Sequence, residues 1–547
     1  MKKLLLVTSL CLVLQLNAAD QNRYFEIAKN MELFTELYKE LNTYYVDDID
    51  PNKLMTDGIH KMLDGLDPFT NYITGADLDE YQLQTTGKYG GIGAVIGKIG
   101  NNVVITDPHE GYPAQKAGLE SGDIILEIDG KTISKYNSDE VSQFLKGEPG
   151  TPITIKVRKA VTNEEKKITF NREEIKIKNV PYYGMVNNNI GYIKLVSFTD
   201  KAAQEVQDAL KDLKAKNTLK GVILDLRGNG GGLLNEAIDI CNTFVDKGVN
   251  IVNTKGKTAE SNFSYATSGK PVDIEIPLTV LTDGGSASAS EIVSGSIQDL
   301  DRGVIIGQNT YGKGLVQTTK PLPYKSKLKV TISKYYIPSG RCIQRIDYSH
   351  RNADGIANAL PDSLRKEFKT KVGRTVKDGA GIEPDVKTED MRVAPITIAL
   401  YNNNHIFNFA NQYKHDHSTL RDNSKYSMSD AEYEQFVAYL KGKEYDYTTS
   451  SELQLDDLKK AVKSDNYSET VQKTITELEK EIKHDKSKDL EKYKPEIKRI
   501  LEQEITSRYL YESGRIANSL REDEEVKKAV EILNDAAKYK SILSAQK

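Results

Sequence analysis

A run of alternating serines and a lysine framed by glycines are the residues of this 547-residue chain best suited to nucleophilic chemistry. The run is Ser286–Glu291, and Lys313 follows its middle serine, Ser288, by 25 residues. No histidine occurs between His109 and His350. A serine nucleophile needs a base, which is usually histidine, and lysine is an accepted substitute. The pattern therefore predicts a serine peptidase that works without histidine.

The serine run is expected to lie in a strand–turn–helix. An apolar strand is predicted over 278–282, a turn at Asp283-Gly284-Gly285, and a helix over 289–300. Backbone amides at the start of a helix have no partner within it, so the amide of Ala289 is a candidate donor to an oxyanion. The residues alone do not choose between Ser286, Ser288 and Ser290 as nucleophile. An ordinary serine cap on a helix is the alternative interpretation.

A second glycine-rich segment, Arg227–Gly232, follows a predicted strand over 221–226. In α/β folds the active site lies at the carboxyl ends of strands. Consecutive glycines leave backbone N–H groups unshielded, so this loop is a candidate source of the second oxyanion donor. The alternative is a simple turn between strand and helix.

Lys313 must lose its proton before it can act as a base. A lysine in water is almost wholly protonated at neutral pH, so the hypothesis requires a pocket that excludes water. Gly312 and Gly314 suit close packing of the backbone around this side chain. The segment from Gly307 to Lys313 resembles a phosphate-binding loop, but glycine at 314 offers no hydroxyl for magnesium. We expect neither a metal nor a cofactor.

The predicted secondary structure changes along the length of the chain. Residues 20–87 are predicted to be helical, with Phe25, Ile27, Met31, Phe34, Leu37 and Leu41 near a 3.6-residue period. Short strands with polar turns are predicted at 94–99, 102–107, 123–128 and 153–158, with a hairpin turn at Asp129-Gly130 and short helices at 113–117 and 138–145. Strands and helices alternate over 190–340, which indicates an α/β domain. Beyond residue 390 the chain is charged and helical, and a packed helical appendage is expected.

The N-terminus has the pattern of a secretory signal sequence. Lys2 and Lys3 precede the apolar run 4–14, and small residues follow at Ala18-Ala19. This run is too short to span a bilayer. The sequence therefore predicts cleavage of residues 1–19 and a periplasmic or otherwise extracytoplasmic enzyme. Cys241 and Cys342 would remain, and we expect free thiols.

Composition excludes two other classes of protein. The formal net charge of −4 gives no sign of the basic surface that a nucleic-acid-binding protein needs. The absence of an apolar stretch near 18 residues excludes a multispan membrane protein.

Together these motifs resemble the C-terminal processing (tail-specific) peptidases, serine peptidase family S41, over about residues 30–390. The motifs are the serine run, 310–317, 225–232, the closing Gly381–Asp385, and a PDZ-like segment inserted before the core. The resemblance implies a crotonase-like (ClpP-like) α/β core. It implies Ser288 as nucleophile, Lys313 as base, Gln317 as the residue that positions the lysine, and Ala289 and Gly232 as oxyanion donors.

The resemblance also implies that the PDZ segment binds the C-terminus of a substrate. Gly91, Ile92 and Gly93 offer amides to a terminal carboxylate, and an exposed strand edge can pair with the incoming peptide. Val141 and Leu145, one turn apart, either line the side-chain pocket or belong to the core of the segment.

The predicted protein is multidomain α/β. Its segments are a signal peptide (1–19), a helical region (20–87), a PDZ domain (88–172), an S41 peptidase core (173–389) and a charged helical extension (390–547). The predicted function is a Ser/Lys serine endopeptidase that cleaves extracytoplasmic proteins with free C-termini. A homodimer through the helical regions and an adaptor protein are its candidate partners. The rival hypotheses are an inactive PDZ-containing adaptor or scaffold and a histidine-dependent esterase.

Overall fold

The computed structural model describes residues 2–75, 77–389, 392–486 and 488–545, and for 2–21, 424 and 483–486 it describes the backbone alone. The predicted signal peptide includes Met1, which lies outside the described residues, and residues 2–19, whose side chains are not described. Within the described part of the chain, no helix is both long enough and apolar enough to cross a bilayer. The chain divides into two compact units, one of residues 1–73 with 319–330 and one of residues 74–318 with 331–547.

The first unit is mainly helical. It contains α1 (Lys2–Tyr44), α2 (Pro51–Asp64) and the short strand β1 (Asn71–Ile73), which pairs antiparallel with the first residues of β18 (Lys327–Tyr336). The sequence predicts a helical region over 20–87 and does not predict the strand β1 within it. Three residues are too few to show a period, and the partner strand lies far along the sequence. Of the six apolar residues predicted along α1, Leu41 is partly buried and the others are exposed, with Phe25 at 63%, Met31 at 62% and Leu37 at 58%.

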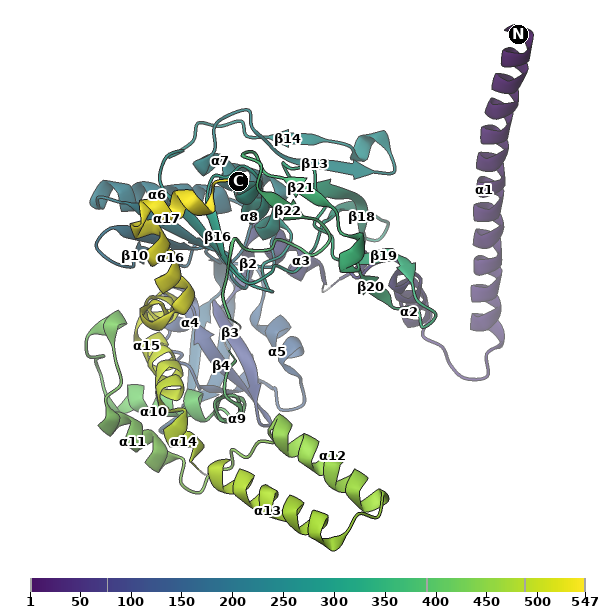
Figure 1. Ribbon diagram of the computed structural model, residues 1–547. Helices are drawn as coiled ribbons and strands as arrows, with labels where there is room; N and C mark the ends of the chain where they lie inside the picture. The colour runs from purple at the N-terminus through teal and green to yellow at the C-terminus, as the bar shows by residue number, and fades with distance from the viewer. Residues whose placement is uncertain (1, 76, 390–391, 487, 546–547) are drawn as a thin grey trace. The chain divides into compact units, whose positions relative to one another are not determined.

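The second unit begins with α3 (Asp77–Thr86) and a small β domain (Figure 1). Its strands and helices are β2 (Lys88–Gly91), β3 (Ala94–Ile99), β4 (Asn102–Pro108), α4 (Pro113–Lys116), β5 (Ile124–Ile128), β6 (Lys131–Thr132), α5 (Ser138–Leu145), β7 (Pro152–Arg158), β8 (Glu165–Asn171) and β9 (Glu173–Lys176). The sheet order is β3-β4-β5-β7-β8, with β6 on β5 and a separate pair of β2 and β9. Asp129 and Gly130 both have positive φ, of 50° and 80°, which confirms the predicted tight hairpin turn.

A six-stranded sheet forms the centre of the second unit. Its elements are β10 (Tyr182–Met185), β11 (Ile190–Lys194), α6 (Ala202–Lys216), β12 (Gly221–Asp225), α7 (Leu234–Phe244), β15 (Leu278–Thr282), α8 (Ala289–Asp299), β16 (Val304–Gly307) and β23 (Val386–Lys387). The order is β10-β11-β12-β15-β16-β23, parallel except for the edge strand β10. The predicted strand and helix alternation of this region is confirmed.

Side chains alternate between the two faces of this sheet, as the two-residue period of a strand requires. On one face Val222, Leu224 and Val280 pack with α6, α7 and α8. On the other face Ile223 and Leu281 pack with helices from the C-terminal end of the chain. Both faces are covered, which is what a parallel sheet requires.

Further strands surround this sheet. They are β13 (Asn250–Gly256), β14 (Ser264–Ala266), β17 (Leu315–Pro321), β19 (Ile346–Arg351), β20 (Ala357–Ala359), β21 (Glu367–Lys369) and β22 (Thr375–Lys377). The end of β18 pairs with β13, which in turn pairs with β14, while β17 also pairs with β18. Short 3₁₀ helices lie at η1 (Ala259–Ser261), η2 (Asp362–Leu364), η3 (Asn423–Lys425) and η4 (Leu520–Glu522).

The C-terminal extension is helical, as predicted. Its helices are α9 (Pro395–Asn402), α10 (His405–Asp416), α11 (Asp430–Tyr439), α12 (Ser450–Ser464), α13 (Glu469–Lys486), α14 (Asp489–Lys492), α15 (Lys494–Ser519), α16 (Glu524–Asn534) and α17 (Ala536–Ile542). Helices α9, α10, α11 and α15 share a core of their own. Helices α16 and α17 instead pack on the central sheet, on the face opposite α6, α7 and α8 (Figure 1). A Cβ on Gly221 would lie 2.8 Å from a methyl of Leu533, so glycine lets α16 approach β12 closely.

Candidate active site

Ser288 lies at the tip of a strained turn between β15 and α8. Its φ of 55° and ψ of −111° fall outside the backbone regions that residues other than glycine favour. Such strain persists only where the surroundings hold it in place. Here the Ser288 amide donates to Oε2 of Glu291 at 2.8 Å, and its carbonyl accepts from the amides of Glu291 and Ile292. The first turn of α8 therefore fixes this residue.

Burial separates the three serines that the sequence leaves equivalent. Ser286 and Ser290 are fully buried, and their hydroxyls donate to the carbonyls of Leu226 and Asn229 at 2.8 Å each. Ser288 alone of the three is partly exposed. A substrate can therefore reach Ser288 without the turn opening, whereas the other two hydroxyls fasten the turn to the glycine-rich loop.

The glycine-rich loop lies directly against Ser288. A Cβ on Gly231 would lie 2.9 Å from both the Ser288 Cβ and the Ala289 amide nitrogen, so only glycine fits there. The Gly231 amide already donates to the side chain of Asn229 at 2.9 Å. Gly230 and Gly232 remain as the candidate oxyanion donors of this loop, and Ala289 opens α8 beside them.

Lys313 lies on the next loop, between β16 and β17. A Cβ on Gly312 would lie 2.5 Å from the Cβ of Arg345, and a Cβ on Gly314 would lie 2.8 Å from the amide nitrogen of Gln344. Glycine on both sides of Lys313 therefore lets this loop pack closely against residues 344 and 345. Lys313 itself is partly buried.

Glu291 joins the two loops. Its side chain is fully buried and accepts four hydrogen bonds, from Thr310 Oγ1 at 2.6 Å and from the amides of Gly312, Ser288 and Lys313 at 2.7–2.9 Å. Burial raises the pKa of Glu291 to about 7, against the four hydrogen bonds, which lower it. Above that pH the ionised carboxylate accepts from all four donors.

Tyr335, on β18, provides a second link between the loops. Its hydroxyl lies 2.5 Å from the carbonyl oxygen of Lys313 and 3.2 Å from that of Ser288. Sequence reasoning missed both Tyr335 and Glu291. The position of Glu291 three residues after a helix-capping serine was a usable signal, because it matches a capping box. Tyr335 carries no comparable local signal.

The remaining predicted residues lie in different settings. Gln317 is on β17, where its Nε2 donates to Thr331 Oγ1 at 3.1 Å. Ile92, Val141 and Leu145 are buried in the core of the small β domain, which favours the core interpretation for the last two. Strand β3 is an edge of that domain's sheet, pairs with β4 among the described strands, and contacts α5.

Two other sequence features have a structural outcome. Cys241 and Cys342 are free thiols among the described residues, as expected. His350 is strongly exposed, and its Nδ1 makes both the contact with Ser349 and the contact with Asp347. A catalytic triad instead uses the two nitrogens of the ring for different partners. This histidine therefore does not support the esterase hypothesis.

Comparisons with known proteins agree with this architecture. The model of peptidase family S41 matches residues 189–350, a PDZ domain model matches 104–159, and a model of a probable PDZ-protease C-terminal helical domain matches 396–533. The chain is 38% identical over 330 residues to a carboxy-terminal-processing protease of Bartonella bacilliformis, covering 60% of this chain and 74% of the relative. It is 35% identical over 317 residues to a probable CtpA-like serine protease of Staphylococcus aureus, covering 57% of this chain and 62% of that relative.

A solved structure titled photosystem II D1 C-terminal processing protease is 27% identical, with a TM-score of 0.35, and the match covers 65% of this chain and 92% of that one. The fold and site define a serine-type peptidase with an S41 core, a PDZ domain and a C-terminal helical domain. The chain belongs to the carboxy-terminal-processing proteases of family S41.

Proposed function

We propose that this protease is an endopeptidase with a Ser288/Lys313 catalytic dyad. Lys313 Nζ takes the proton of the Ser288 hydroxyl as the oxygen attacks the scissile carbonyl. It then gives this proton to the leaving amine as the peptide C–N bond breaks and the acyl-enzyme forms. The amides of Ala289 and Gly232 stabilise the oxyanion. Water then attacks the acyl-enzyme and the neutral lysine takes a proton from it. The lysine returns this proton to Ser288 Oγ as the acyl–oxygen bond breaks and the carboxylic acid product leaves. Gln317 positions the lysine side chain.

The observation that carries this proposal is the shared carboxylate of Glu291. Ser288 and Lys313 belong to different loops, yet both amides donate to the same Oε2, at 2.8 Å and 2.9 Å. The two residues are therefore neighbours, and their relative position is fixed by a buried group. An inactive scaffold has no need of such a link beside a strained, partly exposed serine.

The experiment that tests the dyad is cleavage of an unfolded substrate by the full chain and by single variants. Ser288→Ala abolishes turnover, whereas Ser286→Ala and Ser290→Ala retain substantial activity because their hydroxyls only bond to carbonyls. Undiminished turnover in Ser288→Ala would contradict the dyad. Inactivity of the unmodified chain on every substrate with a free C-terminus would favour the scaffold hypothesis.

Substrate selection is assigned to the PDZ domain. We propose that the amides of Gly91, Ile92 and Gly93 bind the terminal carboxylate and that the peptide extends β3 as an added strand. The edge position of β3 and its contact with α5 support this, since a groove between an edge strand and a helix can hold an extended peptide. Val141 and Leu145 stay candidates for the floor of that groove, although both are buried in the domain core.

Location and assembly follow from the N-terminal region. We propose that the signal sequence directs the enzyme to the periplasm or another extracytoplasmic compartment, where it cleaves protein substrates. The exposed apolar side chains of Phe25, Met31 and Leu37 on α1 support a homodimer through the helical regions. An adaptor protein is the other candidate partner. A sedimentation measurement of the full chain separates a dimer from a monomer.

A further inference from the structure

Helix α16 brings two carboxylates of the C-terminal extension to the point where the glycine-rich loop begins. Asp523 caps this helix and Glu525 lies in its first turn. The guanidinium of Arg227 donates to Glu525 Oε2 at 2.7 Å and lies 2.9 Å from Asp523 Oδ2. The three side chains are each less than one-fifth exposed, so solvent screens these ion pairs weakly.

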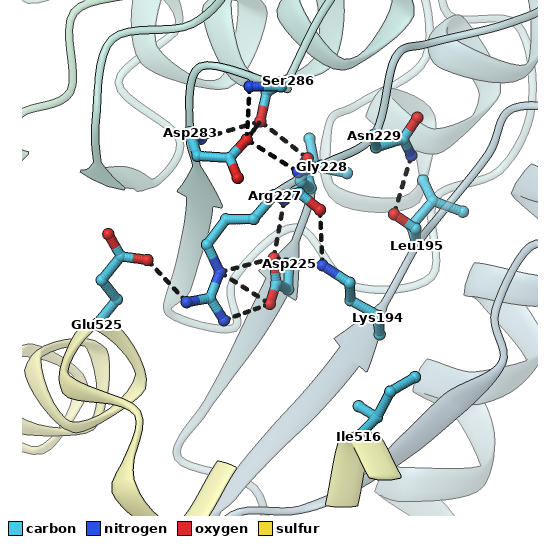
Figure 2. A network of polar contacts seen from close by, with 12 residues as sticks. Lys194, Leu195, Asp225, Arg227, Gly228, Asn229, Asp283, Ser286, Ile516 and Glu525 are labelled. Carbon is cyan, nitrogen blue, oxygen red and sulfur yellow. Dashed lines mark hydrogen bonds and ion pairs between the residues drawn. The ribbon is translucent and has the colours of Figure 1, made fainter. Parts of the chain in front are cut away.

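The same guanidinium is held on its other side by Asp225, at the end of β12. Nη2 donates to Asp225 Oδ2 at 2.6 Å, and Nε lies 3.1 Å from both carboxylate oxygens (Figure 2). Burial raises the pKa of Asp225, but Arg227 and Lys194 outweigh it and hold that pKa below its ordinary value. Lys194 also donates to the Arg227 carbonyl at 2.7 Å. Arg227 is thus fixed at its backbone and at its side chain.

The loop beyond Arg227 connects this cluster to the nucleophile turn. The Gly228 amide donates to Asp283 Oδ1 at 2.8 Å, and Ser286 Oγ lies 3.2 Å from the same oxygen (Figure 2). The Asn229 carbonyl accepts from the Ala287 amide at 3.0 Å and from Ser290 Oγ at 2.8 Å. The contacts of Gly228 and Asn229 join the start of the loop to the turn that carries Ser288, whereas the contact of Ser286 with Asp283 lies within that turn.

The glycines of this loop make a single backbone conformation costly in entropy. Gly228, Gly231 and Gly232 have φ of 69°, 98° and 154°, and glycine pays the largest conformational entropy of any residue to stay in one backbone state. An oxyanion donor must be placed to within about 0.5 Å. A restraint at the start of the loop therefore affects the chemistry at its end.

We propose that Arg227 is a positioning residue through which helix α16 holds the loop 227–232 in its catalytic geometry. The last helices of the chain are then part of the catalytic unit and not an appendage. This inference rests on the proposed serine-protease function. It assigns to Asp523 and Glu525 a role in the rate of hydrolysis and none in substrate binding.

The test uses the full chain with Asp523→Asn combined with Glu525→Gln. Asparagine caps a helix as well as aspartate does, so this change removes the charge and keeps the cap. Glutamine keeps the size of Glu525 and an oxygen for Thr388 Oγ1, which donates to Glu525 Oε1. Glu531→Gln, on the exposed side of the same helix, is the matched control.

The readouts are kcat and KM on an internally quenched peptide, with the melting temperature measured in parallel. We expect kcat to fall at least tenfold in the double variant, with KM changed less than twofold, since loss of a whole oxyanion donor costs about 10²–10³ in kcat. Glu531→Gln keeps the wild-type kcat. Glu525→Asp, which keeps the carboxylate, retains more of the kcat than Glu525→Gln does.

Two results would overturn the inference. One is a wild-type kcat in the double variant. The other is a fall in kcat that matches the unfolded fraction, because the ion pairs would then only stabilise the fold. Hydrolysis by Ser288→Ala, included in the same assay, would instead overturn the proposed function on which the inference rests.

Discussion

The backbone amides of Ser288 and Lys313 both donate hydrogen bonds to one oxygen atom, Oε2 of the buried Glu291. The other oxygen of that carboxylate accepts from Thr310 and Gly312, on the same loop as the lysine. Two loops that are separate in sequence are therefore joined through a single side chain, and the joint consists of hydrogen bonds to a charged acceptor. Such bonds contribute about 1.5–3 kcal/mol each.

Glu291→Gln is expected to lower both activity and stability. A glutamine amide presents one oxygen and one NH₂ group, so the NH₂ group must face backbone amides that are themselves donors. We expect the free energy of unfolding at pH 4, where the wild type keeps the full contribution of Glu291, to fall by about 1–3 kcal/mol, the penalty for unsatisfied buried groups. Urea titration measures it, and Glu531→Gln serves as an exposed control. An unchanged free energy would show that the carboxylate does not hold the loops.

The pH dependence of stability provides a second check on Glu291. Burial raises the pKa of Glu291 to about 7, against 4.5 in an unperturbed side chain. The unfolded chain therefore loses this proton at lower pH than the folded chain. Its stabilising contribution is complete below about pH 4.5 and is lost as pH rises to about 7, by about 3 kcal/mol. The stability advantage of the wild type over Glu291→Gln should shrink over this interval, and a constant difference would exclude the titration.

The backbone of Ser288 predicts a difference between two inactive variants. Both Ser288→Ala and Ser288→Gly lack the hydroxyl, but alanine must adopt φ near 55° whereas glycine does so freely. Holding a residue with a Cβ in a sparsely populated region of backbone conformation costs roughly 1–3 kcal/mol. Glycine also has the larger entropy in the unfolded chain, which offsets part of this gain. Thermal unfolding should still rank Ser288→Gly above Ser288→Ala, and the reverse order would argue against a strained turn.

Lys313→Arg tests whether the lysine acts as a base. A guanidinium stays protonated at any workable pH, so the arginine variant should be as inactive as Lys313→Ala. The measurement is kcat on the same peptide across the accessible pH range. A Lys313→Arg enzyme with a near-normal rate would leave the lysine an electrostatic role and no role in proton transfer.

The PDZ hypothesis predicts a preference for a free C-terminus. An amide cap removes the charged acceptor from the site formed by Gly91–Gly93 and should weaken binding by about 1.5–3 kcal/mol. The comparison needs one unfolded substrate in two forms, one with a free and one with an amidated C-terminus. Equal KM values for the two would assign the domain to regulation or assembly.

Local patterns predicted the elements of this chain far better than their contacts. The strand over 278–282 was predicted to the residue and the helix after it to within one, because a run of apolar residues, a glycine turn and a second apolar run lie side by side. The choice among three serines was not accessible. Ser286 and Ser290 are buried, and their hydroxyls donate to the carbonyls of Leu226 and Asn229, which lie 60 and 61 residues earlier in the chain.

The same limit applies at both ends of the sequence. Val526, Val530, Leu533 and Ala537 recur at the period of a helix, but α16 ends at Asn534 and Ala537 lies in α17. Nothing in this period predicts that the central sheet is the partner of α16. At the N-terminus the apolar period predicted a helix, yet all the residues on that period except Leu41 are exposed. Periodicity reports which face of a helix is apolar and not what covers it.

The Ser288/Lys313 dyad is tested most directly by locating the covalent adduct of a serine-reactive fluorophosphonate. The full chain is treated with the reagent, digested and sequenced by mass spectrometry. We expect one adduct, on Ser288, which is lost in Lys313→Ala because the hydroxyl then has no base. An adduct on Ser286 or Ser290, or undiminished labelling of Ser288 in Lys313→Ala, would contradict the dyad.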